Sequence, residues 1–201
     1  MKKAVIWASL PNACMITIKD KTFVPFLEPA ELEKRIIELA RSLDADYEGK
    51  NPLFIVVLKG AFLFAAELFK HLGSACEVTF VRLSSYQSLE SSGKVKQIIG
   101  LEESVQGRHV VIVEDIVDTG LTMAQLTAQL SQKGAASVEI ATLLHKPDAL
   151  RENVSIRYLG FTIENRFVVG FGLDYEEQGR NLPGVYVLEG VTKPQSSKVT
   201  K

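Results

Sequence analysis

Helical and strand patterns of apolar residues alternate along the first three quarters of this chain. The apolar residues that follow Glu28-Pro29 have helical spacing. A helix can begin there, because proline is tolerated in the first turn. The run Leu53–Leu58 is apolar throughout, which is typical of a strand covered on both faces. We expect a second, strongly apolar helix from Ala61 to Leu72, ended by Gly73. The inward positions expected for the first helix are Leu32, Ile36, Leu39 and Leu43.

The same alternation continues beyond Gly73. Further strands are expected at Val78–Leu83, residues 109–115 and Val138–Leu144. Between the last two, Thr122–Lys133 has the pattern of a helix that Gly134 ends. Strands that alternate with helices predict an α/β fold, with a doubly wound, mainly parallel sheet flanked by helices. The inward positions of the third helix are Met123, Leu126 and Leu130.

Two parts of the chain depart from this alternation. Ser84–Gly93 is polar and too long for a tight turn, so we expect a mobile loop or lid there. After Leu150 the apolar runs are short, at Ile156–Gly160 and Phe167–Leu173, and predict a small antiparallel cap, or hood, lobe. We therefore expect a single domain over residues 1–201. Its core would span roughly residues 28–150, its hood the N-terminal residues and roughly 151–190, and its flexible tail 194–201.

Composition narrows the class of protein. The chain has 201 residues, 46% of them hydrophobic, which is enough to bury a full core, and its net charge of −1 gives no basic field suited to nucleic acid. No apolar run approaches the ~18 residues that a membrane span requires. Cys14 and Cys76 are expected to be reduced core residues. Ala4–Leu10 superficially resembles a secretory signal, but Pro11–Cys14 is not a small-residue cleavage site, so we expect a cytoplasmic protein, with a secreted precursor as the alternative.

Three carboxylates stand at the end of the most apolar strand. Val110–Val113 runs into Glu114 and Asp115, and Asp118 follows after two apolar residues. Open α/β sheets bind ligands at the carboxyl ends of their strands, and an acid left unpaired in a partly buried crevice is costly. Sugar hydroxyls, a divalent cation or a nearby arginine are the candidate partners. An ordinary acidic strand end paired with a surface lysine is the alternative.

The loop that opens the third helix contains small and hydroxyl residues, Asp118-Thr119-Gly120-Leu121-Thr122. Small residues let the backbone approach an anion, and the first free N–H groups of the helix point at it. The Gly-Lys-Ser/Thr ending of a Walker loop is missing, so ATP hydrolysis is poorly supported. N-capping is the alternative for the loop alone. Together with Glu114 and Asp115, the loop predicts a sugar-phosphate site, with the hydroxyls on the acids and the phosphate on the loop.

The stretch Val111–Thr122 resembles the ribose-phosphate-binding signature of type I phosphoribosyltransferases. The resemblance covers about Leu53 to Glu189, and its other motifs stand in the order found in hypoxanthine-guanine phosphoribosyltransferases. They are Leu58-Lys59-Gly60, Arg82–Tyr86, Lys146-Pro147-Asp148, Phe167–Tyr175 and Arg180–Pro183. The resemblance implies a purine-salvage enzyme that moves 5-phosphoribosyl from phosphoribosyl pyrophosphate to N9 of hypoxanthine or guanine, with Mg²⁺ as cofactor. It also implies a homodimer or homotetramer with small-molecule substrates. From the near-neutral charge and the lack of a long apolar run, we expect neither nucleic acid nor membrane as partner.

The resemblance assigns a role to each residue of the expected site. Asp118 would be the catalytic proton acceptor facing N7 of the purine. Ser85 and Tyr86 would close over the reacting centre as a lid loop. Ribose and its 5′-phosphate would be bound by Glu114, Asp115, Asp118, Thr119, Gly120, Leu121 and Thr122. Pyrophosphate would be bound by Lys59, Gly60, Arg82 and Arg180, often with a cis peptide between Leu58 and Lys59. The purine would contact Lys146, Phe167, Val168 and Asp174, and the metal ligands would be Asp174, Glu114 and Asp115.

Three positions depart from the pattern of the family. Ala61 stands where a second glycine is frequent, and Leu121 occupies a position that is sometimes basic. Gly172 would add flexibility beside the base-reading segment. Two other functions stay open at this point: a regulator that senses phosphoribosyl pyrophosphate and binds nucleic acid, and a transferase that prefers xanthine. The near-neutral charge and the set Lys146, Phe167 and Asp174 favour the hypoxanthine-guanine enzyme.

Overall fold

The computed structural model describes residues 15–87 and 94–190, and its largest element is a six-stranded sheet in the order β5-β4-β3-β6-β7-β8. All neighbouring strands run parallel except β4 and β5, which are antiparallel. The predicted α/β fold with a mainly parallel sheet is therefore confirmed. The strands are β3 Leu53–Leu58, β4 Glu77–Gln87, β5 Lys94–Ile99, β6 His109–Val117, β7 Ser137–His145 and β8 Tyr158–Thr162.

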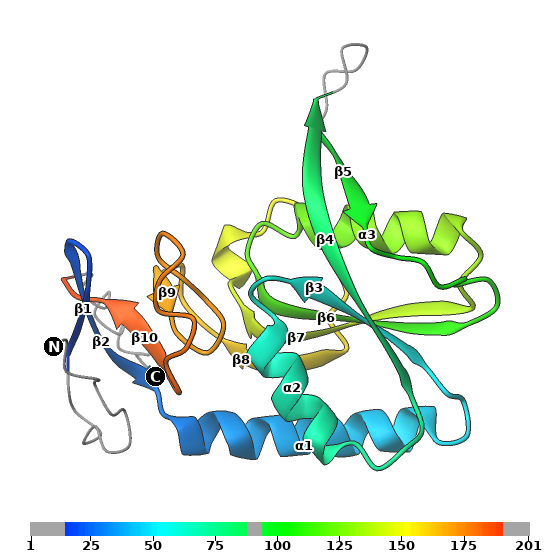
Figure 1. Cartoon of the computed structure of the whole chain (residues 1–201), viewed down its shortest axis with the longest axis horizontal. Helices are drawn as coiled ribbons and strands as arrows, with labels where there is room; N and C mark the ends of the chain where they lie inside the picture. Colours follow the sequence, from blue (N-terminus) through cyan, green and yellow to red (C-terminus); the bar gives the residue numbers. More distant parts are fainter. Residues whose placement is uncertain (1–14, 88–93, 191–201) are drawn as a thin grey trace, which may run out of the picture.

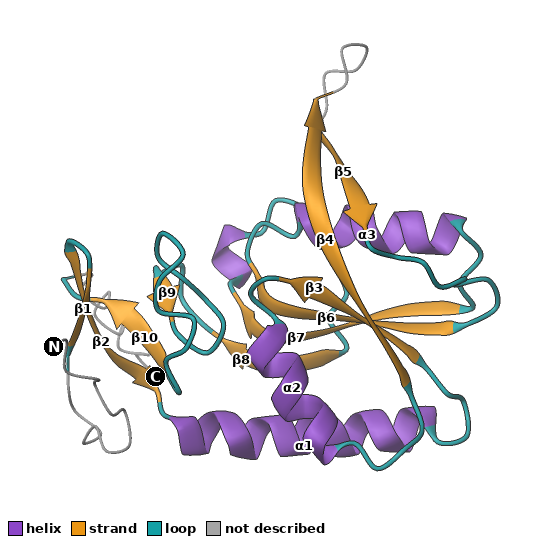
Figure 2. Ribbon diagram, viewed as in Figure 1, coloured by secondary structure: helices purple, strands orange, loops and turns teal. Residues whose placement is uncertain are grey.

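Helices cover both faces of this sheet, with α1 and α2 on one side and α3 on the other (Figure 1). The helices are α1 Pro29–Tyr47, α2 Phe62–His71 and α3 Leu121–Gln132, and a short 3-10 turn, η1, spans Pro147–Ala149. Double coverage explains why Leu53–Val57 of β3 and Val110–Val113 of β6 are buried at every position. The large sheet thus forms the middle layer between helices on its two faces, as in doubly wound α/β folds (Figure 2).

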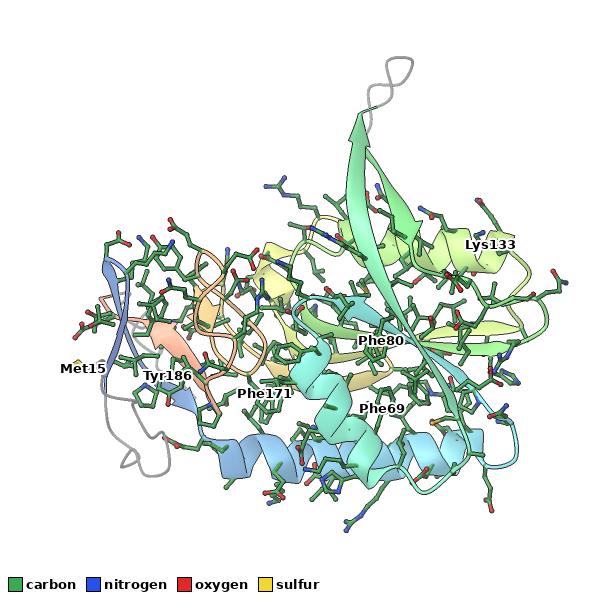
Figure 3. All side chains as sticks on the ribbon, viewed as in Figure 1. Met15, Phe69, Phe80, Lys133, Phe171 and Tyr186 are labelled. Carbon is green, nitrogen blue, oxygen red and sulfur yellow. The ribbon has the colours of Figure 1, made fainter. Side chains whose placement is uncertain are left out.

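The helix α1 begins where the sequence predicts. The side chain of Glu28 accepts from the backbone of Glu31, and Glu31 Oε2 accepts from the Glu28 N–H at 2.9 Å, which forms a capping box. All four inward positions expected for this helix are buried. On α2, Phe69 meets Phe54 of β3 edge to face, with ring centroids 5.3 Å apart (Figure 3). The expected inward residues of α3, Met123, Leu126 and Leu130, are likewise buried against the opposite face of the sheet.

A second, four-stranded sheet forms the hood beside the large sheet (Figure 1). Its strands are all antiparallel and lie in the order β1-β2-β10-β9. Ile18, Phe23, Val169 and Leu182 form a small apolar core of its own. The N-terminal and C-terminal parts of the chain meet in this sheet. The strands are β1 Ile16–Ile18, β2 Lys21–Leu27, β9 Val168–Val169 and β10 Val185–Leu188.

Two sequence predictions about the arrangement are wrong. The run at Ile156–Gly160 was expected in the hood, but β8 pairs in parallel with β7 at the edge of the large sheet. The polar stretch from Ser84 was expected to be a loop, but Ser84–Gln87 continues β4 and pairs with Lys94–Gln97 of β5. This antiparallel pairing satisfies backbone N–H and C=O groups, and the hairpin projects well beyond the sheet (Figure 1).

Some predictions fall outside the described residues. These are the lid residues 88–93, the tail at 194–201, the apolar start and Cys14. Cys76 is a free thiol, and burial raises its pKa. Among the described helices, none is long and apolar enough to cross a membrane.

Candidate active site

The chemically active side chains follow three adjacent strands of the large sheet. Lys59 comes directly after β3, Asp118 after β6 and Lys146 after β7. Because β3, β6 and β7 pair side by side in parallel, their carboxyl ends meet at one edge of the sheet. The three positions, far apart in the sequence, are therefore brought to one place.

Asp118 and Lys146 form the centre of this edge. Lys146 Nζ lies 3.7 Å from Asp118 Oδ2, and the Lys146 N–H donates to the carbonyl of Val117 at 3.0 Å. The Lys146 side chain is 9% exposed, whereas that of Asp118 is 49% exposed. A buried ammonium beside a half-exposed carboxylate presents one donor and one acceptor to the same small space. This pair can bind a planar ligand that carries an acceptor and an N–H side by side.

The loop after Asp118 has the geometry of an anion site. Gly120 has φ +78° and forms the N-cap of α3, and a Cβ on it would lie 2.4 Å from the Glu152 carbonyl oxygen. The carbonyl of Thr119 accepts from the N–H groups of Arg151 and Glu152 at 2.9 and 3.1 Å. Arg151 and Glu152, which follow η1, thus hold the backbone of the loop in place through these hydrogen bonds. Helix N-termini commonly present N–H groups to an anion, and α3 begins directly after this loop.

Asp115 packs against the backbone that follows β3. A Cβ on Gly60 would lie 1.5 Å from Asp115 Oδ2, so only glycine allows this approach. Burial raises the pKa of the Asp115 carboxyl, while the Ile116 N–H, which donates to Oδ1 at 2.8 Å, and the charge of Arg180 act in the opposite direction. Glu114 precedes it on β6, is partly buried and lies opposite Thr142 of β7. Two carboxylates therefore stand at the end of β6, as the sequence predicts.

Gly172 joins the hood to the large sheet. Its φ is +100°, and a Cβ on it would lie 2.0 Å from the Gly60 carbonyl oxygen. The sequence suggested that Gly172 adds flexibility, but the structure shows a close packing position that requires glycine. Gly172, Gly60 and Asp115 therefore form a stack that runs from the hood, through the turn after β3, to β6. The peptide between Leu58 and Lys59, next to this stack, is cis.

The hood contributes an aromatic face and an acid–base pair. Phe167 is 42% exposed, and its ring lies 6.1 Å from that of Phe23 and 5.8 Å from that of Tyr175. Arg180 Nη2 lies 2.6 Å from Asp174 Oδ1, and Arg180 Nη1 donates to the Gly172 carbonyl at 2.9 Å. Arg180 is therefore fixed beside both the hood acid and the stack. Val168, which follows Phe167, is buried in β9.

Arg82, Ser85 and Tyr86 lie on β4. Arg82 pairs with Leu58 of β3 and is exposed, so it stands next to Lys59 across two neighbouring strands. Ser85 and Tyr86 pair with Lys96 and Val95 of β5. The expected lid residues therefore belong to a strand, and their backbone is fixed in the hairpin.

A family model described as a phosphoribosyl transferase domain matches residues 27–176. This chain belongs to the phosphoribosyltransferase family. A relative from Lactococcus lactis, named hypoxanthine-guanine phosphoribosyltransferase, is 48% identical over 166 residues, which is 82% of this chain and 88% of the relative. A Bacillus subtilis protein of the same name is 44% identical over 160 residues, 79% of this chain and 89% of the relative.

Solved structures of the family agree with this assignment. A hypoxanthine phosphoribosyltransferase from Staphylococcus aureus superposes with a TM-score of 0.76 at 36% identity, covering 82% of this chain and 90% of that one. A hypoxanthine-guanine phosphoribosyltransferase from Bacillus anthracis gives a TM-score of 0.74 at 33% identity, covering 82% and 96%. None of these relatives supports the alternative of a nucleic-acid-binding regulator.

Sequence reasoning missed one residue of this phosphoribosyltransferase site, Glu177. Its carboxylate Oε2 lies 2.9 Å from Lys59 Nζ and 3.5 Å from Arg180 Nη2. The hydrogen bond from Lys59 holds the pKa of the Glu177 carboxyl below its ordinary value. No motif in the sequence indicates this contact, because the residues that form it are 118 positions apart. Glu177 links the hood to the loop after β3.

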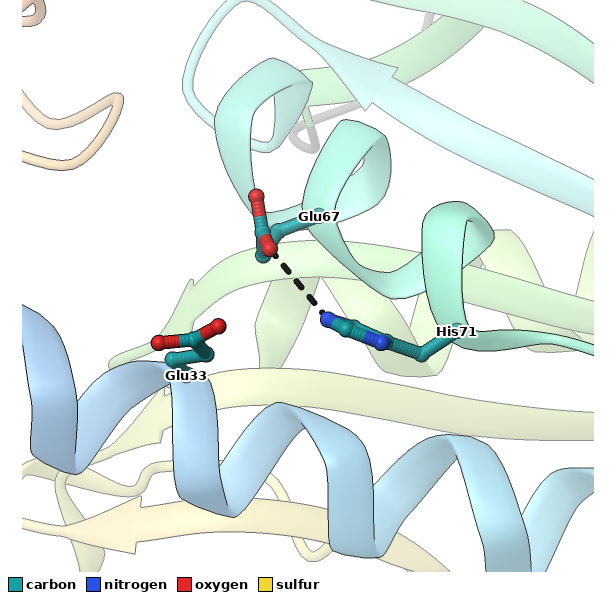
Figure 4. A group of neighbouring side chains, drawn as sticks. All are labelled: Glu33, Glu67 and His71. Atoms are coloured by element: carbon teal, nitrogen blue, oxygen red, sulfur yellow. Dashed lines mark hydrogen bonds and ion pairs between the residues drawn. The ribbon is translucent and has the colours of Figure 1, made fainter.

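A second group of titratable side chains lies away from this site, between α1 and α2 (Figure 4). Glu33, Glu67 and His71 bring three ligand-type atoms within 4.8 Å of one another. Sequence spacing gave no sign of this group, because Glu33 belongs to a different helix. Glu67 already accepts from Lys70 at 2.9 Å and lies 3.3 Å from His71 Nε2. The contacts of Glu67 are those of ion pairs along the surface of a helix.

Proposed function

We propose that this protein transfers 5-phosphoribosyl from phosphoribosyl pyrophosphate to N9 of hypoxanthine or guanine, releasing pyrophosphate and giving IMP or GMP. The observation that carries the proposal is the pair Asp118 and Lys146, 3.7 Å apart beside the anion loop at the end of β6. A 6-oxopurine carries the O6 acceptor and the N7 position on neighbouring atoms. One donor and one acceptor at this spacing suit that edge.

In this proposal the base lies between the strand ends and the hood. Lys146 donates to O6, which selects a 6-oxopurine over adenine because the amino group of adenine is itself a donor. Asp118 holds or accepts a proton at N7 while N9 becomes the nucleophile. The exposed face of Phe167 stacks on the ring, and the backbone of Val168 reads its edge. Asp174 lies at the 2-position, where its carbonyl can accept from the amino group of guanine.

The sugar and its phosphate lie on the end of β6 and the loop that follows. Glu114 and Asp115 accept from the ribose hydroxyls, and Asp118 to Thr122 surround the 5′-phosphate. The N–H groups at the start of α3 and the hydroxyls of Thr119 and Thr122 supply donors. The exposed Leu121 adds no charge, so the phosphate relies on backbone donors more than on cations.

The leaving group lies between the end of β3 and the hood. Lys59, Arg82 and Arg180 supply positive charge, and Gly60 lets the backbone approach. The carboxylates of Glu114, Asp115 and Asp174 suit Mg²⁺, because this ion prefers oxygen ligands and a cation beside the buried Asp115 offsets the cost that raises its pKa. When bound, Mg²⁺ would neutralise part of the negative charge of the pyrophosphate.

Catalysis in this arrangement is positioning and electrostatic stabilisation. The bond from C1′ to the pyrophosphate oxygen breaks as the bond from N9 to C1′ forms, and positive charge develops on the ribose. Asp118 and the acids of β6 face that charge, while the cations of the hood and β3 face the departing pyrophosphate. Closure of the β4–β5 hairpin, which carries Ser85 and Tyr86, would exclude water that hydrolyses the donor. We also expect a homodimer or homotetramer that acts in the cytoplasm.

A panel of purine bases tests the proposal. The purified protein is incubated with phosphoribosyl pyrophosphate, Mg²⁺ and hypoxanthine, guanine, xanthine or adenine, and nucleotides are separated by chromatography. We expect IMP and GMP but no AMP. Product with xanthine alone would replace the proposal by a xanthine-preferring transferase, and binding of RNA or DNA without any nucleotide synthesis would replace it by a regulator.

A further inference from the structure

Glu177 contacts two of the three cations that the proposed function assigns to pyrophosphate, Lys59 and Arg180. A single carboxylate oxygen, Oε2, lies 2.9 Å from Lys59 Nζ and 3.5 Å from Arg180 Nη2. Lys59 comes from the end of β3 and Arg180 from the hood, so the carboxylate bridges two parts of the site. An oxygen anion held between a lysine and an arginine has the same chemistry as a pyrophosphate oxygen in that place.

The turn that carries Glu177 aims it at these cations. Tyr175 and Gln178 exchange backbone hydrogen bonds of 2.9 and 3.0 Å, which closes a tight turn around two consecutive glutamates. Glu176 and Glu177 have φ of +48° and +66°, values that residues other than glycine rarely adopt. The Glu177 N–H donates to Asp174 Oδ2 at 2.8 Å, which ties the turn to the neighbouring acid.

The neighbouring glutamate of the turn has a different partner. Glu176 forms an ion pair with Lys19, in the turn between β1 and β2 of the hood. The two acids therefore lie in the same turn and carry the same charge, but they contact different lysines. Glu176 provides a matched control for Glu177.

The contact of Glu177 is suited to exchange. The side chains of Lys59 and Glu177 are 52% and 66% exposed, so their ion pair is weak and readily replaced. Asp174 is the closer partner of Arg180, at 2.6 Å, and would stay beside it when Glu177 leaves. An incoming pyrophosphate must take Lys59 from Glu177, and the displaced carboxylate remains nearby as a like charge.

We infer that Glu177 competes with the pyrophosphate group for Lys59 and Arg180 and so weakens binding of the phosphoribosyl donor and of free pyrophosphate. This inference rests on the proposed function, which assigns those cations to pyrophosphate. The competition acts on the pyrophosphate side of the site alone. The purine side, at Lys146 and Phe167, has no contact with Glu177 among the described interactions.

The test compares Glu177→Gln with Glu176→Gln, two substitutions that remove the same charge from the same turn. Steady-state assays with hypoxanthine give KM for each substrate and the inhibition constant of pyrophosphate. We expect Glu177→Gln to lower KM for the donor and the inhibition constant by about 2- to 5-fold, with KM for hypoxanthine unchanged. The difference should fade at high salt, where exposed charges are screened. Glu176→Gln should leave all three constants near those of the unaltered protein.

Two results would overturn the inference. A donor KM that is unchanged or raised in Glu177→Gln would show that Glu177 positions Lys59 instead of competing for it. An equal fall in Glu176→Gln would show a general effect of net charge. Calorimetric titration of both variants and the unaltered protein with pyrophosphate and Mg²⁺ needs no turnover. If Glu177→Gln binds pyrophosphate more tightly than the unaltered protein does, but neither protein makes any nucleotide, this inference stands and the proposed function is refuted.

Discussion

Lys146 and Asp118 meet at the carboxyl ends of adjacent strands, 3.7 Å apart, with the lysine buried and the aspartate half exposed. The Lys146 N–H donates to the Val117 carbonyl, and Asp118 begins the loop that opens α3. The carboxylate of Asp118 offsets the charge of the Lys146 ammonium, so this buried donor does not stand alone. A base that binds here must use both groups, and this requirement makes each of them testable separately.

Replacement of Lys146 by Met should reduce kcat/KM for hypoxanthine by about 10- to 100-fold, because a charged hydrogen bond to O6 is lost. KM for the phosphoribosyl donor should change little, since the donor lies on the other side of Asp118. Steady-state kinetics with each substrate varied separately measures both constants. The matched control is Lys133→Met at the exposed end of α3. Equal effects of the two substitutions would remove Lys146 from the base site.

Glycine at 172 should be required for the contact between hood and sheet. We expect Gly172→Ala to lower Tm by at least about 5 °C and to raise the donor KM, because its Cβ would lie 2.0 Å from the Gly60 carbonyl oxygen. Gly49→Ala is the matched control, since Gly49 also has positive φ, +71°, but no atom within 4 Å of an added Cβ. Thermal melting and donor titration check both. Equal falls in Tm and in donor affinity in the two variants would show that the effect at Gly172 comes from backbone strain alone and not from the contact with Gly60.

Ionisation of the Asp115 carboxyl should lower the free energy of unfolding. Burial raises the pKa of its carboxyl above the ordinary 3.8, so the folded state disfavours the charged form. The cost is absent below pH 3.8, grows as the pH rises from 3.8 to the raised folded pKa, and is complete above that pKa. Without Mg²⁺ or substrate, Asp115→Asn should therefore raise Tm at pH 7 by about 2–4 °C while it weakens donor binding.

The measurement is thermal melting of both proteins from pH 3 to pH 8. The gain should shrink towards the acid end of the series, where the unaltered carboxyl is protonated as well. A gain that is the same at every pH, or a loss at pH 7, would contradict the assignment of the effect to the ionised carboxylate.

The parts of the fold that follow from local pattern were predicted correctly. Leu53–Leu58 is apolar at every position and forms the buried strand β3, and Glu28-Pro29 begins α1 with a capping box. These features depend on residues close in the sequence. The pairing of β8 with β7 does not, and a short apolar run such as Ile156–Gly160 is equally compatible with a parallel edge and an antiparallel lobe.

The site was predictable where a motif lies on one strand and its loop. Glu114, Asp115 and Asp118 fall at the end of β6 because an apolar run stops there. The role of Glu177 depends on a left-handed turn that directs it towards Lys59, and no local pattern indicates such a turn. The packing of Gly172 on Gly60 likewise depends on how the hood sits against the sheet, so its glycine was misread as a source of flexibility.

The most direct test of the account is the turnover of Asp118→Asn with hypoxanthine. If Asp118 accepts the proton at N7, kcat should fall by about 10²- to 10⁴-fold, because asparagine keeps the shape of the side chain but accepts no proton. Donor affinity, measured by calorimetry without base, should stay within about 3-fold, since the phosphate is bound mainly by the N–H groups of the loop. Turnover close to that of the unaltered enzyme would contradict the role of Asp118, and with it the proposed chemistry of the edge formed by β6 and β7.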